Sequence, residues 1–285
     1  MYECILYKEL PDEEVQCIAC NHRCIIDKDK RGICGVRENR EGKLYLLVYG
    51  LIISENVDPI EKKPLYHFLP NTKTYSIGTV GCNFKCYFCQ NYRISQLREI
   101  VGQDITPEEI VERAIKTGCK SISYTYNEPT ISAEFVKQTA ILARQKGLKN
   151  ILVTNGYMTK ECLEFLGKDI DAMNIDLKSF DEKFYNKICK ARLKPVLETI
   201  KLAHEKGIHI EITTLVVPGE NNSVNQFEKI ARFISNIDKN IPWHISRFFP
   251  MYKMKDKQPT SLDVLKKAEA IGKKYLKYVY IGNVW

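Results

Sequence analysis

The stretch TYSIGTVGCNFKCYFCQN, residues 74–91, decides how the rest of the sequence is interpreted. Its first part, residues 74–80, is rich in β-forming residues and is ended by a glycine, which predicts a short buried strand. Its second part places Cys82, Cys86 and Cys89 within eight positions. Three thiols directly after a strand predict a metal site or a redox site at that point of the fold.

After residue 70 the sequence alternates regularly between strand and helix patterns. Thr106 starts a typical helix as N-cap, with Pro107 and Glu109 in its first turn, and a glycine ends it. Repeated strand–helix units predict a parallel sheet whose ligands bind at the carboxyl ends of its strands. The sequence predicts six strands with a further, seventh one, which is too few for an eight-stranded barrel. A doubly wound sheet and an incomplete barrel both fit this number. Strands are expected at 74–80, 121–126, 150–156, 171–178, 209–217, 243–249 and 278–282, with helices at 106–118, 132–147, 160–167, 195–207, 224–237 and 261–276.

Composition narrows the class of protein. The 285-residue chain carries a formal charge of +8 with lysines spread along its length, which indicates a solvated surface rather than a nucleic-acid patch. The N-terminus lacks the pattern of a secretory signal, and no apolar run approaches the roughly 20 residues that span a bilayer. We therefore expect a cytoplasmic protein without a membrane partner. In that compartment the 11 cysteines indicate reduced thiols and metal ligation rather than disulfides.

The N-terminal segment, residues 1–66, is predicted to be a Cys-rich and irregular unit ahead of a main domain at 67–285. The spacing Cys17-x2-Cys20-x3-Cys24-x9-Cys34 offers four thiols at distances that a closed metal site could use, with His22 as a spare ligand. Zinc and an iron–sulfur cluster both accept four thiolates, so both stay open, together with no metal. The segment 56–71 is expected to be an extended linker. Cys4, Cys119, Cys162 and Cys189 have no partners at ligand spacing.

The three thiols at residues 82–89 have three interpretations. Structural zinc normally takes four protein ligands, and a redox pair formed by Cys86 and Cys89 leaves Cys82 without a role. A cubane iron–sulfur cluster also normally takes four thiolates. With three protein ligands one iron keeps an open coordination position, which is a catalytic feature.

The motif C-x3-C-x-(aromatic)-C resembles the signature of the radical S-adenosylmethionine (radical SAM) superfamily. The resemblance extends over roughly residues 70–282 and implies a partial (β/α)6 barrel of the TIM type. More narrowly, the sequence resembles homologues of the pyruvate formate-lyase activating enzyme and the AmmeMemoRadiSam-type family. The segments that carry this are DPIEKKPLYHF, GCNFKCYFCQN, YTYNEPT, VTNGY, NIDLKSF, LVVPGEN, RFFPMY and YIGNV.

The resemblance implies a mechanism. Cys82, Cys86 and Cys89 would hold a [4Fe–4S] cluster whose fourth iron binds the amino and carboxylate groups of SAM. One electron, from a donor such as flavodoxin or ferredoxin, would cleave the sulfonium to methionine and a 5′-deoxyadenosyl radical. The radical would abstract hydrogen from a substrate, and the activating-enzyme resemblance suggests a protein modified in glycyl-radical activation under anaerobic conditions.

The resemblance also implies residues that contact SAM after the first two strands. Phe88 would lie near the adenine. TYNEPT occupies the place of the superfamily's Gly-Gly-Glu segment, which makes Glu128 a candidate partner of the SAM ammonium. Tyr126 and Asn127 replace the two glycines, so the backbone part of that contact departs from the family pattern.

Two later strand ends carry further candidates. Thr154 and Asn155 follow the third strand in a segment similar to the family's Asp-Thr-Asn-Gly, with Val153 in place of the acid. NIDLK resembles the activating enzymes' Asp-x-Lys strand, so Asp176 and Lys178 are expected to face SAM. Alternate positions of one strand share a face, and charges inside an apolar strand need a partner or a function.

Three side chains are weaker candidates. Tyr252 lies in a loop that should cap the SAM pocket, and His244 could line the barrel interior. His67, in the linker, is expected to be structural. Taken singly, each polar residue at a strand end is as readily explained as a turn or helix cap.

Two alternatives to protein activation remain at this stage. A radical SAM enzyme could modify RNA or a small molecule, although no KH or RRM signature is present. A protein of another class, a non-catalytic zinc-binding interaction protein, would use both cysteine groups structurally.

Overall fold

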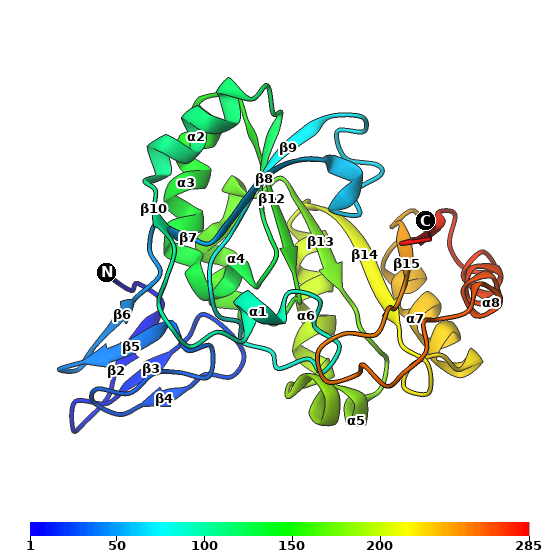
Figure 1. Cartoon of the computed structure of the whole chain (residues 1–285), viewed down its shortest axis with the longest axis horizontal. Helices are drawn as coiled ribbons and strands as arrows, with labels where there is room; N and C mark the ends of the chain where they lie inside the picture. Colours follow the sequence, from blue (N-terminus) through cyan, green and yellow to red (C-terminus); the bar gives the residue numbers. More distant parts are fainter. Residues whose placement is uncertain (285) are drawn as a thin grey trace.

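The body of the computed structural model, which describes residues 1–284, is a curved sheet of eight strands (Figure 1). Its order is β16-β15-β14-β13-β12-β11-β9-β8, and every neighbouring pair is parallel except the antiparallel pair β8·β9. The sheet has two free edges, so the expectation of a partial (β/α)6 barrel of the TIM type is confirmed. The strands are β8 (Ser54–Pro59), β9 (Lys73–Gly78), β11 (Ser121–Tyr124), β12 (Lys149–Thr154), β13 (Ala172–Asp176), β14 (His209–Val216), β15 (Trp243–Arg247) and β16 (Val279–Gly282).

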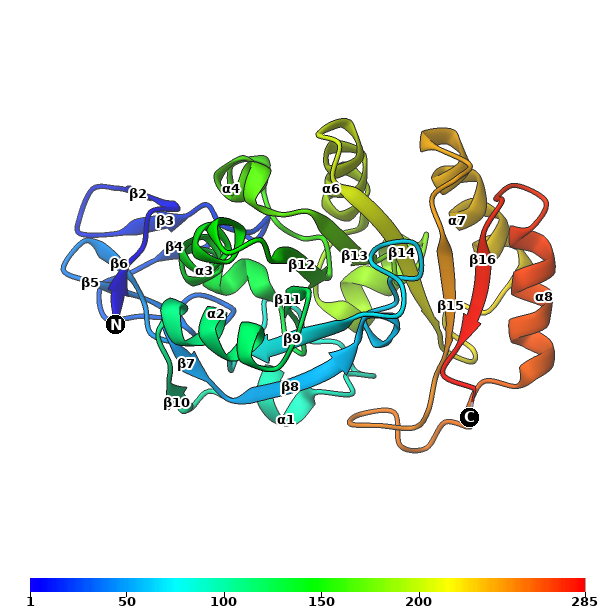
Figure 2. The ribbon, with the colours of Figure 1, turned by 90° about the horizontal axis from the view of Figure 1, so that it is seen from above.

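Helices follow the convex side of this sheet from α2 at one end to α8 at the other (Figure 2). They are α2 (Pro107–Lys116), α3 (Ala133–Gln145), α4 (Lys160–Leu166), α6 (Leu193–Glu205), α7 (Val224–Ile237) and α8 (Leu262–Gly272), with the short α1 (Tyr92–Ser95) and α5 (Glu182–Phe184) on the connecting loops. The N-cap expected at Thr106 is present as a reciprocal capping box with Glu109. α6 begins two residues before Pro195, which therefore lies within the first turn, where its missing N–H costs no helical hydrogen bond.

The expected linker at 56–71 is the main correction to the predicted elements. Residues 54–59 form β8, an edge strand that pairs with β9 along its whole length, and a 3-10 turn follows at Ile60–Lys62. β8 lies before the domain boundary predicted at residue 66, although it belongs to the main sheet. The division of the chain into two domains at that residue stays a prediction.

The N-terminal segment is more regular than expected. It contains two small antiparallel sheets, β1-β6-β5 and β2-β3-β4, and the strand β7, which pairs with β10 from beyond the cysteine loop. Their strands are β1 (Tyr2–Glu3), β2 (Tyr7–Glu9), β3 (Val15–Cys17), β4 (Ile25–Ile26), β5 (Arg37–Arg40), β6 (Lys43–Leu46), β7 (Leu51–Ile52) and β10 (Gln103–Asp104). A fully buried ion pair joins β5 to α3, since both carboxylate oxygens of Glu134 accept from the Arg37 guanidinium.

The concave side of the sheet is lined by buried polar side chains. Thr74 and Ser123 share a hydrogen bond of 2.7 Å there, and Glu211 and Asn174 are fully buried. A barrel interior with this many polar groups is suited to a polar ligand at the open ends of its strands. Over residues 1–284, no helix is long and apolar enough to cross a membrane; a cytoplasmic location stays a prediction.

Candidate functional site

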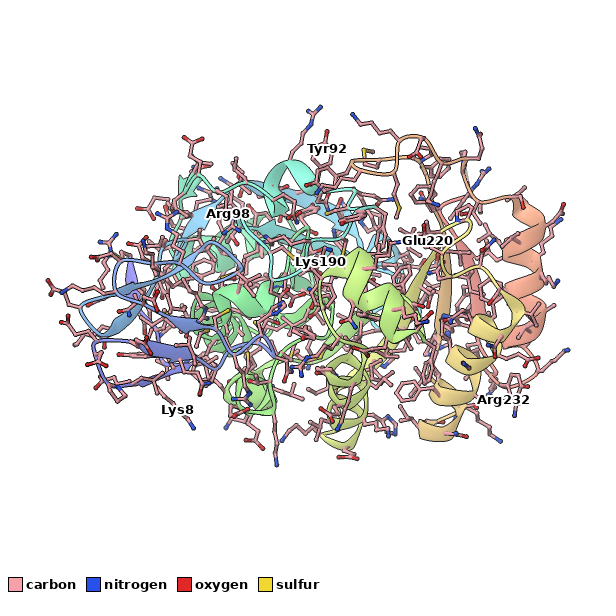
Figure 3. The ribbon with its side chains drawn as sticks, turned by 90° about the horizontal axis from the view of Figure 1, so that it is seen from below. Lys8, Tyr92, Arg98, Lys190, Glu220 and Arg232 are labelled. Atoms are coloured by element: carbon pink, nitrogen blue, oxygen red, sulfur yellow. The ribbon has the colours of Figure 1, made fainter. Side chains whose placement is uncertain are left out.

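A cavity of about 740 Å³ opens at the carboxyl ends of the parallel strands. This is the size range of cofactor pockets. Figure 3 shows this end of the molecule, with Tyr92 at its rim and Arg98 beside the N-terminal sheets. Most of the residues predicted for the site line this cavity, together with several of their neighbours. The lining includes Cys82, Cys86, Phe88, Cys89, Tyr126, Asn127, Val153, Thr154, Asn155, Asn174, Asp176, Lys178, Thr213 and His244.

The three predicted thiols lie together in this wall, on the loop between β9 and α1. Cys82 and Cys86 are buried and Cys89 is half-buried. The backbone N–H of Phe84 donates to Cys82 Sγ at 3.4 Å, and Cys89 Sγ lies 3.1 Å from Ser95 Oγ. Burial and the neighbouring Glu128 raise the pKa of the Cys82 thiol well above its usual range. These thiols are therefore protonated until a metal displaces the proton.

Cys189 is a fourth thiol beside this group that the sequence did not indicate. A hydrogen bond with Cys189 is the main cause that raises the pKa of Cys86, followed by burial. The backbone fixes the contact, since Lys85 N–H donates to Cys189 C=O at 2.9 Å. Cys189 is fully buried and lies outside the cavity wall in the described part of the chain. It is positioned to support Cys86 rather than to face the cavity.

Asp176 and Lys178 form an ion pair at the end of β13. Lys178 Nζ lies 2.7 Å from Asp176 Oδ2 and 5.7 Å from the centre of the Phe88 ring. Burial by itself would lower the pKa of Lys178, but the Asp176 carboxylate outweighs burial and raises this pKa well above its usual range. The ammonium is therefore charged and buried, while its partner Asp176 is one-third exposed towards the cavity. It could bind a carboxylate that enters the cavity.

Thr154 and Asn155 line the cavity, whereas Glu128 lies beneath it. Thr154 Oγ1 and Asn155 N–H each donate to the Glu128 carboxylate at 2.7 Å, and Thr130 donates to it from the other side. Within residues 1–284 Glu128 is fully buried and lies outside the cavity wall. Its carboxylate orients the turn that follows β12, and its contact with the SAM ammonium stays a prediction. Burial raises its pKa against the hydrogen bonds that lower it.

The turn after β12 is tied to the cysteine loop. Asn155 Nδ2 donates to Asn83 Oδ1 at 2.7 Å, next to Cys82. Gly156 adopts φ +69°, and a Cβ there would lie 2.8 Å from Ile175 Cγ2. The TNG sequence therefore serves a turn, as its composition suggested, and this turn places Asn155 between the cavity and the thiols.

Asn127 contributes to the site in a way that the sequence did not predict. Its Nδ2 donates to Gly81 C=O at 3.0 Å and to Thr79 Oγ1 at 2.9 Å, which clamps the start of the cysteine loop. The neighbouring Tyr126 donates to Asp58 Oδ2 at 2.8 Å. The side chains that replace the family's glycines thus hold β8 and the loop together.

The three weaker candidates, His244, Tyr252 and His67, have different surroundings. His244 lines the cavity and lies 2.6 Å from Glu211 Oε2. Tyr252 stacks on Tyr92 with ring centres 4.8 Å apart, and within residues 1–284 it lies outside the cavity wall. The contribution of Tyr252 and its loop to the SAM pocket stays a prediction. His67 bonds to Tyr280 Oη at 2.7 Å, consistent with the structural role expected for it.

The residues of the cysteine loop and the strands around it also match a known protein family. A family model described as the radical SAM superfamily matches residues 76–234, which include the end of β9, the three thiols and four further strands of the main sheet. The chain belongs to the radical SAM superfamily. It is therefore an enzyme, and the interpretation as a non-catalytic zinc-binding protein is set aside.

Relatives of this radical SAM enzyme agree with the narrower resemblance. An uncharacterized protein of Methanocaldococcus jannaschii is 47% identical, over 100% of this chain and 86% of that protein. The pyruvate formate-lyase-activating enzyme of Clostridium pasteurianum is 24% identical, over 69% of this chain and 87% of that enzyme. Among solved structures, a radical SAM methyltransferase from Sphaerobacter thermophilus matches with TM-score 0.60 at 15% identity, over 75% of this chain and 67% of that one. That likeness shows the shared fold.

Membership implies a [4Fe–4S] cluster and SAM, and the residues present fit both. Three thiols without a fourth in the cavity wall match a cluster with one open iron. Asn174 Oδ1 and Thr213 Oγ1 lie in the same wall and have no hydrogen-bond partner among the described residues. Buried polar atoms rarely stay without partners, so both indicate a polar ligand such as SAM.

Proposed function

We propose that this enzyme cleaves SAM reductively in the cavity at the strand ends and abstracts hydrogen from a protein substrate, in the manner of glycyl-radical activation. The observation that carries this proposal is the meeting of three thiols, a buried ammonium and unpartnered polar atoms in one cavity. A reductant of the flavodoxin or ferredoxin type would supply the electron.

The cysteine loop would hold the cluster and the opposite wall would orient SAM. Cys82, Cys86 and Cys89 supply thiolates, and when bound, the cluster supplies the one-electron cleavage of the sulfonium. Lys178 would bind the SAM carboxylate, and Asp176 would accept from the ammonium or a ribose hydroxyl. Phe88, 4% exposed within the wall and stacked on Phe184 with ring centres 6.0 Å apart, would contact the adenine.

Asn155, Thr154 and Glu128 would act through position rather than chemistry. The chain Glu128–Asn155–Asn83 joins the turn after β12 to the cysteine loop by hydrogen bonds of 2.7 Å. It therefore sets the distance between the wall that orients SAM and the thiols. Proximity and orientation of this kind contribute much of an enzyme's rate enhancement.

The protein-substrate part of the proposal is supported by the activating-enzyme relative from Clostridium pasteurianum, which matches most of this chain. RNA and small molecules are the alternatives. A formal charge of +8 is compatible with RNA, but this charge is distributed along the whole sequence.

The test follows hydrogen from substrate to 5′-deoxyadenosine. Cells of the source organism are grown in deuterated medium, and their lysate is separated into protein, RNA and small-molecule fractions. Each fraction is incubated anaerobically with reconstituted enzyme, a reductant and unlabelled SAM. We expect deuterium in 5′-deoxyadenosine with the protein fraction. Deuterium from the RNA or small-molecule fraction alone would overturn the protein substrate, and the Cys82/Cys86/Cys89→Ala variant is the control.

A further inference from the structure

A second group of thiols lines a small cavity in the N-terminal segment, separate from the cavity of the SAM site. Cys17, at the end of β3, and Cys20, Cys24 and Cys34 all line it. The rest of the wall is mainly apolar, from Ala19, Ile26, Ile33 and Ile131, with Gly32, Arg37 and Thr130. Four thiols that converge from separate turns on one cavity are unusual in a segment with so few other buried polar groups.

The backbone holds these thiols in fixed turns. Cys17 N–H donates to Cys24 C=O at 2.9 Å, and Arg23 N–H donates to Cys20 C=O at 3.0 Å. On the other side, Gly35 N–H donates to Gly32 C=O at 2.9 Å, which closes the turn that carries Cys34. The four side chains are therefore directed by hydrogen-bonded backbone and not by thiol contacts alone.

Four cysteine thiols are a donor set that both a structural zinc and a cubane cluster accept. Within residues 1–284, no three His, Cys, Asp or Glu side chains are close enough together to ligate one metal ion. That holds for Cys17, Cys20, Cys24 and Cys34, and it holds equally for the thiols of the SAM site. Structural zinc draws four thiolates to about 2.3 Å from one centre, whereas a cubane holds them around a larger body.

We propose that Cys17, Cys20, Cys24 and Cys34 bind an auxiliary [4Fe–4S] cluster. All four irons then have protein thiolates, so this cluster has no open position for SAM. His22 is not required as a ligand: its Nε2 lies 2.8 Å from Asn83 C=O, and its side chain is outside the cavity wall in the described chain.

The charge around the cavity favours an anionic group. Arg37 lines it, and Arg98 lies against the turn, since a Cβ on Gly35 would approach Arg98 Nη1 to 2.8 Å. Figure 3 shows Arg98 beside this part of the chain. Arg37 is already paired with Glu134, so Arg98 is the cation more available to balance the charge of four thiolates.

The two cysteine loops are in direct contact. Gly81 precedes Cys82 at φ +87°, and a Cβ there would lie 2.8 Å from Cys34 C=O. Cys20 pairs with Met158 through an isolated β-bridge, just beyond the turn that contains Asn155. A cluster in the N-terminal segment would therefore stabilise the wall against which the SAM-site loop packs.

The test measures how much iron is bound by a variant that lacks the three cysteines of the SAM site. The Cys82/Cys86/Cys89→Ala protein is reconstituted anaerobically with iron and sulfide, and iron, zinc and labile sulfide are measured with Mössbauer spectra. We expect about four irons and four sulfides per chain, against about eight irons in the unsubstituted protein. Cys4→Ser is the matched control, because Cys4 is buried nearby but outside the cavity wall.

Two outcomes would overturn the proposal. One is a folded triple variant, with the circular dichroism spectrum of the parent, that binds no iron; the other is a variant that binds one zinc per chain. If the triple variant does not fold, the iron content of the double variant Cys20→Ser/Cys34→Ser is measured in the otherwise native protein. The proposal requires this content to fall from about eight irons per chain to about four. Retention of about eight irons in that protein contradicts it.

Discussion

Glu211, on β14, offers a prediction whose magnitude follows from its contacts. Its side chain is fully buried at the base of the barrel interior. The backbone N–H groups of Tyr66 and His67 donate to its two oxygens at 3.0 and 2.8 Å, and His209 and His244 contact the same oxygens. One carboxylate thus joins the segment before β9 to two strands and positions His244 in the cavity wall.

The pKa of Glu211 gives the size of the effect. Burial by itself would raise this pKa, but the hydrogen bonds from His209, His244 and Tyr66 outweigh burial and lower it from 4.5 to about 2. That shift corresponds to about 3 kcal/mol of folding stability. Because the folded pKa is depressed, this stability is present above pH 4.5 and is lost as the pH falls towards 2.

The perturbation is Glu211→Gln, which keeps the shape of the side chain but leaves an amide facing an N–H donor. We expect the free energy of unfolding at pH 7 to fall by about 3 kcal/mol, and the difference from the parent to shrink to about half at pH 3. Guanidinium unfolding of cluster-free protein measures both values. Glu112→Gln, on the exposed face of α2, is the matched control.

Two results would refute this reasoning. The first is an unchanged free energy of unfolding at pH 7 in Glu211→Gln. The second is a loss of similar size that does not diminish towards pH 3, since that would indicate a packing defect rather than loss of an ionised carboxylate.

Two further predictions concern the cavity. Lys178→Met removes the buried ammonium and, with it, the charged hydrogen bond proposed for the SAM carboxylate. The Kd of SAM for cluster-loaded protein should therefore rise roughly 10- to 100-fold by calorimetry, with Lys178→Arg intermediate; an unchanged Kd would place SAM elsewhere. Cys189→Ala should leave the iron content and 5′-deoxyadenosine formation intact, because Cys189 lies outside the cavity wall of the described chain; loss of about four irons would make it a ligand.

The sequence predicted the parallel strands well because they are short apolar runs, and β11, β12, β13 and β14 each follow a helix ended by a glycine. Asn174, Asp176 and Lys178 were placed on one face by their alternate spacing, and all three line the cavity. The three thiols were found through their local spacing. These are features that neighbouring residues determine.

Features that depend on distant residues could not be predicted. The sequence did not indicate that Thr130, Thr154 and Asn155 surround the Glu128 carboxylate and bury it. Cys189 is 100 positions beyond Cys89 and meets Cys86 only through the loop after β13. β8 carries the polar sequence SENVDP, which reads as a linker because an edge strand needs only one apolar face. Periodicity alone could not identify any of these.

The central claim is that the three thiols of the SAM site carry the cluster that cleaves SAM. The measurement is 5′-deoxyadenosine formed when anaerobically reconstituted, reduced protein is incubated with SAM and analysed by mass spectrometry. We expect 5′-deoxyadenosine and methionine from the parent protein and none from Cys82/Cys86/Cys89→Ala. Iron-loaded parent protein that forms no 5′-deoxyadenosine would exclude SAM cleavage, and a triple variant that still forms it would exclude these thiols as ligands of the cluster.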